Sequence, residues 1–211
     1  MVRKIVEHVP YKTLQKDLKK YERMAFELGA SDAKIITTDM VVIDERVRAK
    51  CIYPKCQYYG TNAHCPPHAP ELDWMRKLVN SYKYAIFLRS RVPTELLAAE
   101  RTPKQLADYK AVRRKALETI GKIESAAFYD GYYLAVGFGC GTCKLIFCAD
   151  SDCKVLKGQS CAGSQRSRAS MEAVGMDVYK LATKVGWDIY PIGKAPSDAP
   201  YGTIAGIVFI Y

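Results

Sequence analysis

The residue type in this sequence most able to do chemistry is cysteine, because all eight cysteines fall in two short segments. The first segment, with the spacing C-x4-C-x8-C, contains Cys51, Cys56 and Cys65. The second, with the spacing C-x2-C-x4-C-x4-C-x7-C, contains Cys140, Cys143, Cys148, Cys153 and Cys161. Thiols gathered in this way are typical of metal or redox sites rather than of scattered core residues. We therefore expect all eight cysteines to be metal ligands.

Two kinds of metal group fit these spacings. A structural zinc site pairs two cysteine knuckles into a closed tetrahedron, and the knuckle at 51–56 could pair with the one at 140–143. Iron–sulfur clusters also take thiolates, often three that are close in sequence and one that is distant. The Cys65-Pro66 pair has the ending that follows the last cysteine of ferredoxin runs. We favour an iron–sulfur cluster of the 4Fe–4S type, with zinc as the alternative.

The division into three and five cysteines leaves the number of clusters open at one or two. Two four-thiolate clusters need one cysteine to cross between the segments, as in two-cluster ferredoxins, and indicate electron transfer. A three-thiolate cluster with one open iron would act as a Lewis acid in non-redox chemistry such as sulfur removal or hydration. The leading hypothesis is electron transfer or a cluster-dependent redox reaction. The alternatives are the open-iron enzyme and a zinc-stabilised module that binds RNA or protein, so the sequence does not decide whether the chain is an enzyme.

Polar residues close to the cysteines are further candidates for the site. His64 and His68 flank Cys65, and each could be a ligand, a proton donor or an incidental loop residue. Arg166 and Arg168 follow the last cysteine and could neutralise a cluster or bind an anion. The two arginines would act beside the metal, whereas either histidine could also be a ligand.

Three other charged features have an ordinary structural explanation. Glu172 could relay protons to the metal, but a role at the start of a helix is favoured. Asp177 is predicted to cap a helix over 178–185. The basic residues at 110–115, Arg113 among them, are predicted to form the solvated face of a helix. An RNA or an acidic partner protein is the alternative for that face.

Alternating helices and strands must position these residues. Apolar spacing predicts helices over 11–29, 71–81 (with Trp74 and Leu78 inward), 103–131 and 178–185. Strand character is found over 33–47, 83–92, 132–139, 187–193 and 203–211, with a turn-rich segment at 194–200. The expected fold is a single α/β domain over 1–211, with a mixed sheet layered with helices. It carries two cysteine-rich metal-binding insertions at about 51–68 and 139–170. The second insertion has no clear helical or strand periodicity, so something other than regular secondary structure must hold it, and its five cysteines could do so.

Composition narrows the class of protein. The 211 residues are 49% hydrophobic and 26% charged, as in a globular domain rather than a disordered chain. No apolar run approaches a membrane span, and the N-terminal residues lack the apolar core of a secretory signal peptide. The expected location is the cytoplasm, where thiols serve metals more often than disulfides. The net charge of +10 is compatible with a redox partner protein and leaves nucleic acid unlikely but not excluded.

The stretches CIYPKCQYYGTNAHCPPHAP, CKVLKGQSC and SRASMEAVGMDV together resemble a family of predicted metal-binding proteins, a domain of unknown function common in archaea and anaerobic bacteria. The matching residues are Cys51, Cys56, Tyr59, Gly60, Cys65, Pro66, Pro67, Cys153, Cys161, Ser170, Glu172, Gly175 and Asp177. The similarity extends from about residue 30 to 190. It implies metal binding, and this chain has more cysteines around CGTCKLIFC than the family pattern.

Overall fold

A four-stranded antiparallel sheet is the centre of the computed structural model, which describes residues 2–193 and 199–211. Its strands lie in the order β1-β2-β4-β3, and their bounds are β1 (Asp32–Thr37), β2 (Tyr84–Val92), β3 (Val136–Phe138) and β4 (Gly202–Phe209). The two long strands, β2 and β4, pair along almost their whole length, from Ala85 opposite Phe209 to Val92 opposite Gly202. They form the rigid centre to which the rest of the chain attaches.

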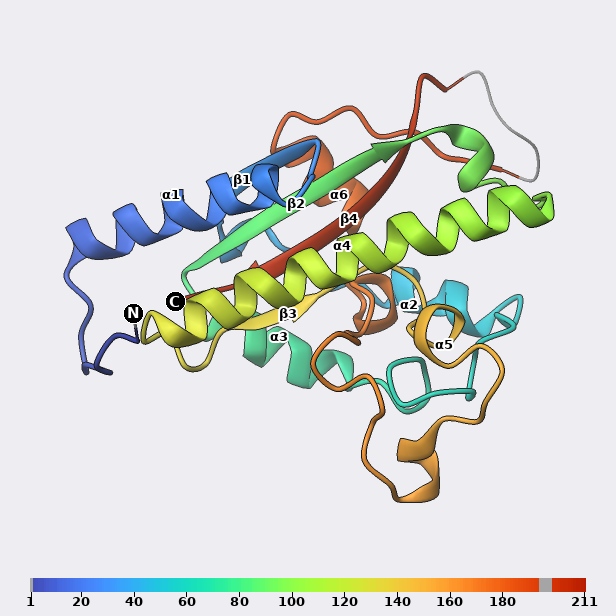
Figure 1. Cartoon of the computed structure of the whole chain (residues 1–211), viewed down its shortest axis with the longest axis horizontal. Helices are drawn as coiled ribbons and strands as arrows, with labels where there is room; N and C mark the ends of the chain where they lie inside the picture. The colour runs from blue at the N-terminus through green and yellow to red at the C-terminus, as the bar shows by residue number, and fades with distance from the viewer. Residues whose placement is uncertain (1, 194–198) are drawn as a thin grey trace.

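Six α-helices accompany the sheet in the described part of the chain: α1 (Tyr11–Glu27), α2 (Glu45–Ile52), α3 (Leu72–Asn80), α4 (Pro103–Tyr129), α5 (Lys144–Phe147) and α6 (Val178–Lys184). Short 3-10 turns are η1 (Thr38–Met40), η2 (Thr94–Leu96), η3 (Lys154–Lys157) and η4 (Glu172–Val174). Figure 1 shows α1 and α4 crossing one face of the sheet, while α3 and α6 lie behind it. The sheet is therefore the middle of three layers.

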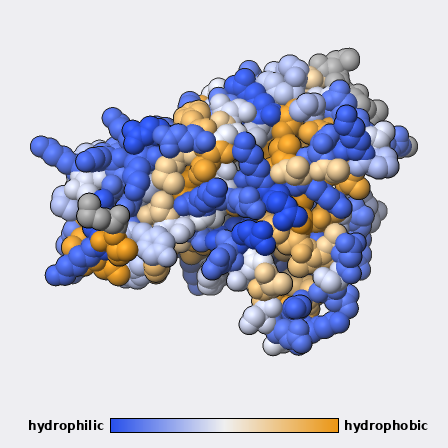
Figure 2. Space-filling view, in the orientation of Figure 1, coloured by the Kyte–Doolittle hydropathy of each residue, from blue (hydrophilic) through white to orange (hydrophobic). Residues whose placement is uncertain are grey.

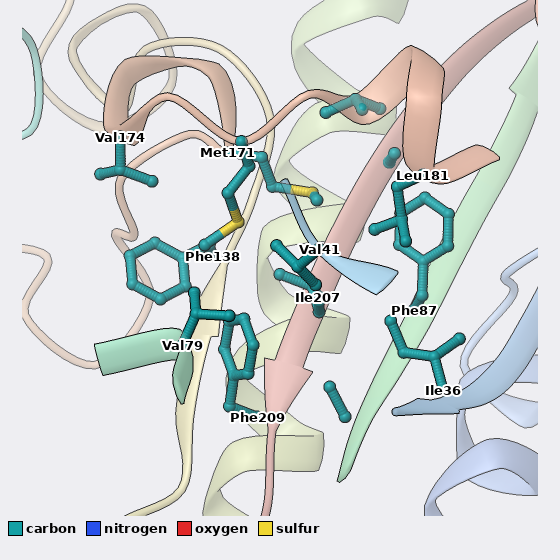
Figure 3. Close-up of a cluster of buried hydrophobic side chains, with 14 of the residues drawn as sticks. Ile36, Val41, Val79, Phe87, Phe138, Met171, Val174, Leu181, Ile207 and Phe209 are labelled. Atoms are coloured by element: carbon teal, nitrogen blue, oxygen red, sulfur yellow. The ribbon is translucent and has the colours of Figure 1, made fainter. Parts of the chain in front are cut away.

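Alternation along the strands gives each face of the sheet its own core. Ile86 and Val208 point towards α1 and α4, where they join a buried cluster that includes Leu18 and Ile120. The next residues on the same strands point to the opposite face. There Phe87, Ile207 and Phe209 pack with side chains from α6 and from the chain around η4 (Figure 3). Both faces are thus covered by apolar contacts, which fixes the strand register.

Helix signals in the sequence are confirmed where capping groups are present. Thr102 and Gln105 form a reciprocal capping box at the start of α4, with Pro103 at its first position. Asp177 caps α6, since its carboxylate accepts a hydrogen bond from the Lys180 backbone N–H at 2.9 Å. Asp177 therefore has the structural role expected from its position.

Several predicted elements are wrong. The sheet is antiparallel rather than mixed, because each described strand runs opposite to its neighbours. Segment 187–193 is not a strand. Trp187 instead stacks on Phe87 with ring centroids 4.8 Å apart, and the Asp188 carbonyl accepts a hydrogen bond from Arg89 at 2.5 Å. Aromatic packing thus replaces strand pairing there. Residues 194–198 of the predicted turn lie outside the described residues.

The predicted strand over 33–47 and the predicted helix over 71–81 also need correction. Strand β1 ends at Thr37, and α2 begins after Asp44, which accepts a hydrogen bond from the Arg46 backbone N–H at 2.8 Å. This cap overrides the strand-like apolar run. In α3 the buried residues are Met75 and Val79, while Trp74 is 53% exposed. Leu78 is partly buried and packs against the core as predicted, so the prediction of an inward side chain is wrong for Trp74 alone.

Candidate metal centre

The second cysteine segment is a loop whose two ends are bridged, and the first is tied on its N-terminal side to the chain after η4. Segment 139–170 leaves the sheet after β3 and returns to the same point, where Gly139 and Ser170 form a parallel bridge. The chain before α2 is joined to the chain after η4 by an antiparallel bridge between Ile43 and Met176. Residues 51–68 and 140–168 make up what we call the cysteine lobe. Figure 1 shows the lobe below the first half of α4, beyond the sheet.

Four thiols of the second segment line one small enclosed cavity of about 30 Å³; they are Cys143, Cys148, Cys153 and Cys161. Local turns bring them together. Cys143 and Cys148 flank the single turn of α5, and Cys153 directly precedes η3. The chain then turns at Gly158, which has a left-handed φ of 73°, before it reaches Cys161. The cavity is thus a place where one group could be bonded by four sulfurs.

The first cysteine segment supplies the wall of this cavity. Asn62, which is 1% exposed, accepts a contact from the Cys143 Sγ at 3.7 Å and a hydrogen bond from the His64 backbone N–H at 3.0 Å. Its amide also donates to the Thr142 hydroxyl at 3.2 Å. The His64 side chain lines the cavity, and its Nδ1 is buried without a hydrogen-bond partner among the described residues. His64 is therefore the histidine that the structure brings to the thiols.

The thiols around the cavity have opposite acid–base tendencies. Burial, together with the neighbouring cysteines, raises the pKa of Cys143 to about 12. Burial also opposes ionisation of Cys153, but backbone N–H groups, with that of Ala63 the largest contributor, outweigh it and hold the pKa of Cys153 below its ordinary value. Ionisation is therefore easier for Cys153 than for Cys143.

The thiols of the first segment are close to one another at the end of α2. The Cys56 backbone N–H donates to the Cys51 carbonyl at 3.1 Å. Burial raises the pKa of Cys51, and Cys56 and Cys65 add to the rise. Cys65 also raises the pKa of Cys143, so it acts electrostatically on thiols of both segments. We call Cys51, Cys56 and Cys65 the first set, and the four cysteines around the cavity the second set.

The first set differs from the second in its access to solvent. Cys51 and Cys56 line an open pocket of about 520 Å³ together with Glu172 and Tyr179. Glu172 is the first residue of η4, the helix-start position predicted for it, and it is exposed at this pocket. The surrounding protein still displaces water from its carboxyl group and raises the pKa of Glu172. Glu172 in turn raises the pKa of both Cys51 and Cys140, so it lies near thiols of both segments.

Within residues 2–193 and 199–211, no three His, Cys, Asp or Glu side chains are grouped tightly enough to hold a single metal ion. A family model of predicted metal-binding proteins, DUF2284, matches residues 34–210. The chain belongs to this family. The match contains every cysteine of both sets and Cys140, so the family description applies to the part of the chain that carries the thiols. No curated protein and no solved structure matches the chain.

Other predicted neighbours of the metal have different partners in this DUF2284 protein. Arg168 forms an ion pair with Glu124 at 2.6 Å, and Arg166 lies 3.8 Å from Glu118, so carboxylates of α4 balance both arginines. His68 is exposed, and its backbone N–H donates to the Cys65 carbonyl at 3.0 Å. None of these three side chains lines the enclosed cavity of the second set.

The prediction of a solvated face over 110–115 is wrong for Arg113, which is 3% exposed. Its guanidinium group donates to the carbonyl oxygens of Cys140 and Thr142, the latter at 3.3 Å. The signal missed in the sequence is its position one residue after Val112 on a helix whose inner face is apolar. Among the described residues of this DUF2284 protein, no helix has both the length and the apolar character needed to cross a membrane.

Proposed function

We propose that this DUF2284 protein is an iron–sulfur protein that transfers electrons. Under this proposal, one cluster, most simply 4Fe–4S, is bonded by the second set of thiols and another is bonded at the first set. The observation that carries the proposal is the arrangement of Cys143, Cys148, Cys153 and Cys161 around one enclosed cavity. Four cysteine thiolates are the usual ligands of such a cluster.

The chemistry of the cavity fits an iron–sulfur group. Its lining provides four soft sulfur donors, the ligand type that iron–sulfur clusters and zinc select. The unpartnered Nδ1 of His64 could exchange a hydrogen bond with a sulfur, and backbone N–H groups already point to Cys153. A bound cluster would accept and release single electrons there. Hydrogen bonds of this kind tune the reduction potential of a cluster.

Electron transfer is favoured over catalysis at the second set because the cavity is enclosed, without a wide opening through which a substrate could reach the thiols. Cys65 acts electrostatically on both Cys51 and Cys143, which supports passage of electrons between the two sets. A zinc site would use the same thiols but would not exchange electrons, because Zn²⁺ has no redox chemistry.

The test is purification without oxygen, followed by a visible absorbance spectrum and by iron, sulfide and zinc analysis. The proposal expects a brown protein with roughly eight irons and eight sulfides per chain, the content of two 4Fe–4S clusters. Bleaching of the visible band by dithionite and its return on reoxidation would show the electron transfer. A colourless protein with stoichiometric zinc from the same anaerobic preparation would contradict the proposal.

A further inference from the structure

Ser167 places a hydroxyl group against one thiol of the second set. The residue lines the enclosed cavity and is 6% exposed. Its Oγ lies 3.4 Å from the Cys161 Sγ, which is hydrogen-bond distance when one partner is sulfur. In the part of the chain that the structure describes, Cys161 is the one cysteine whose sulfur has a hydroxyl partner, since the Cys143 Sγ contacts the amide oxygen of Asn62. The hydroxyl therefore distinguishes one of the four thiols.

The turn that carries Ser167 is held by the neighbouring Arg168. The Arg168 Nη1 donates to the Ser167 carbonyl at 2.8 Å and to the Ser164 carbonyl at 3.1 Å. The Ser167 backbone N–H donates to the Gly163 carbonyl at 2.7 Å, which closes the same turn. Both backbone polar groups of Ser167 are thus hydrogen-bonded. The side chain consequently has little freedom to move away from Cys161.

Glu124 of α4 connects this turn to the sheet. Its carboxylate accepts from the Arg168 Nη2 at 2.6 Å and from the Arg168 Nε at 3.0 Å. The same carboxylate accepts from the backbone N–H of Gly137, in β3, at 2.6 Å. The side chains of Arg168 and Glu124 are only 16% and 21% exposed, and a bidentate pair of this kind has a fixed geometry. We call Arg168 and Glu124 the clamp.

The surface of α4 allows the turn to come close. Gly121 lies three residues before Glu124, and a Cβ at that position would be 3.2 Å from the Gln165 carbonyl oxygen. Glycine in the middle of a helix is unfavourable relative to alanine, so the close approach of the turn gives a structural reason for it. The turn therefore packs directly on the helix that carries the clamp carboxylate.

Resting on the proposed function, we infer that Ser167 donates a hydrogen bond to the Cys161 sulfur in the metal-loaded protein and that the clamp holds it in place. A sulfur bonded to a metal keeps lone pairs that accept a hydrogen bond, and the hydroxyl is then the donor. Hydrogen bonds to cluster sulfurs help to set the reduction potential. A donor stabilises the negative charge that reduction adds, so this bond raises the potential of the second-set cluster. Arg168 and Glu124 act through Ser167 and are positioning residues.

The experiment compares Ser167→Ala, Ser167→Thr and Arg168→Gln with the wild type as anaerobically purified, metal-containing proteins. Ser164→Ala is the matched control for the hydroxyl, because Ser164 is an exposed serine of the same turn. Arg166→Gln is the matched control for the charge, because Arg166 follows in the same turn but lies against Glu118. Metal and sulfide per chain are measured first, and reduction potentials are then measured by spectroelectrochemical titration.

We expect Ser167→Ala to keep the wild-type metal content and to move one of the two reduction potentials to a more negative value. Ser167→Thr keeps a hydroxyl and should return that potential towards the wild-type value. Arg168→Gln should move the same potential in the same direction, because the turn is then free to carry the hydroxyl away from the sulfur. Both control variants should have wild-type potentials.

Two backgrounds assign the shifted potential to one set of thiols. Under the proposed function, Cys148→Ser keeps only the first-set group, and adding Ser167→Ala should change nothing. Cys51→Ser keeps only the second-set group, and adding Ser167→Ala should reproduce the whole shift. A general loosening of the lobe would instead move the potential in both backgrounds.

Three results would overturn the inference alone. They are wild-type potentials in Ser167→Ala, an equal shift in Ser164→Ala, and a shift of the first-set group in the Cys148→Ser background. If Ser167→Ala loses the second-set metal altogether, recovery of that metal in Ser167→Thr supports the hydroxyl, and equal loss in Ser167→Thr overturns it.

A wild-type protein with zinc in place of iron and sulfide would contradict the proposed electron transfer but not the hydrogen bond. The inference would then be read from the rate at which a chelator removes the zinc. Faster removal from Ser167→Ala than from Ser164→Ala would support it, and equal rates would overturn it.

Discussion

The sheet and the second cysteine segment are stabilised by opposite means. Each face of the sheet is covered by buried apolar side chains, with Phe87 on one face and Ile86 on the other fully removed from solvent. Between residues 149 and 162, by contrast, every residue is exposed or only partly buried. Figure 2 shows the lobe projecting away from the rest of this face of the molecule. The hydrophobic effect can fold the sheet, but it offers little to this segment.

The difference indicates that the bound metal group stabilises the lobe, whereas the apolar core stabilises the sheet. A loop of this length without its own core needs a device to hold it, and cysteines at positions 148, 153 and 161 are spread evenly along it. Metal binding that orders such a segment contributes directly to its folding free energy. The lobe and the sheet should therefore respond differently to the same treatments.

Removal of the metal should have the largest effect. When the anaerobic protein is treated with a chelator, we expect backbone amides in 148–161 to lose their protection from hydrogen exchange. Amides of β2 and β4 should stay protected, because their pairing depends on the apolar core. Hydrogen-exchange mass spectrometry measures both regions in one sample. Equal loss of protection in β2 and β4 would contradict the comparison.

A substitution that creates a cavity in the core of the sheet should produce the converse result, a loss of stability without a loss of metal. Phe87→Ala removes a buried ring that stacks on Trp187 and should cost about 3–5 kcal/mol in the free energy of unfolding. The metal content of the protein that remains folded should not change. Leu156→Ala, at a site 41% exposed in the lobe and outside the lining of the cavity, is the control and should change stability by less than about 0.5 kcal/mol. Denaturant titration and metal analysis provide the two readouts.

Thiol reactivity should test how much of the folded lobe survives removal of the metal. The thiolate is the form that reacts with iodoacetamide. Because the pKa of Cys143 is raised to about 12 and that of Cys153 is lowered, Cys153 should react before Cys143 near pH 8 in the protein whose lobe stays folded. The rate at Cys143 should rise about tenfold per pH unit up to its pKa, while that at Cys153 levels off at lower pH.

Peptide mapping after timed alkylation measures both rates. Protein unfolded in guanidinium chloride is the control, since the two cysteines should then react alike. Faster reaction at Cys143 than at Cys153 in the folded protein would show that the environments of the two thiols are not as described.

The smallest effect is expected at the start of α4. Thr102→Ala removes the hydroxyl that accepts from the Gln105 backbone N–H and should cost about 1 kcal/mol in unfolding free energy. Because α4 covers the sheet and also carries Arg113, the loss should lower the melting temperature slightly and leave the metal content unchanged. A loss of metal in this variant would mean that the lobe depends on the helix end as well as on the bound group.

The sequence predicts the local elements of this fold well where the signal is local. The Thr102-Pro103 start of α4, the Asp177 cap of α6 and the apolar strands β2 and β4 follow from side chains adjacent in the chain. The direction of strand pairing is not local, and the mixed sheet expected from alternation is wrong. Segment 187–193 has strand-like residues, but Trp187 finds a better partner in the ring of Phe87 than in a neighbouring strand.

The same division applies to the candidate site. The spacing of the cysteines in the sequence already pointed to cysteine ligands in two segments, and the family match supports metal binding. Which thiols share a cavity depends on the turns at α5 and η3, which have no periodic signal. The burial of Arg113 was missed because a basic run on a helix is usually solvated, and only the packing of the lobe onto α4 removes that side chain from water.

The measurement that tests the account most directly is native mass spectrometry of the anaerobic protein, with Cys51→Ser and Cys148→Ser beside the wild type. The account predicts two iron–sulfur groups on the wild-type chain and one on each single variant, because the two cysteines belong to different sets. A chain with both Cys51→Ser and Cys148→Ser should carry no iron–sulfur group. A single group that disappears in both single variants, or zinc in place of iron and sulfide, would contradict the claim that the lobe binds two separate clusters.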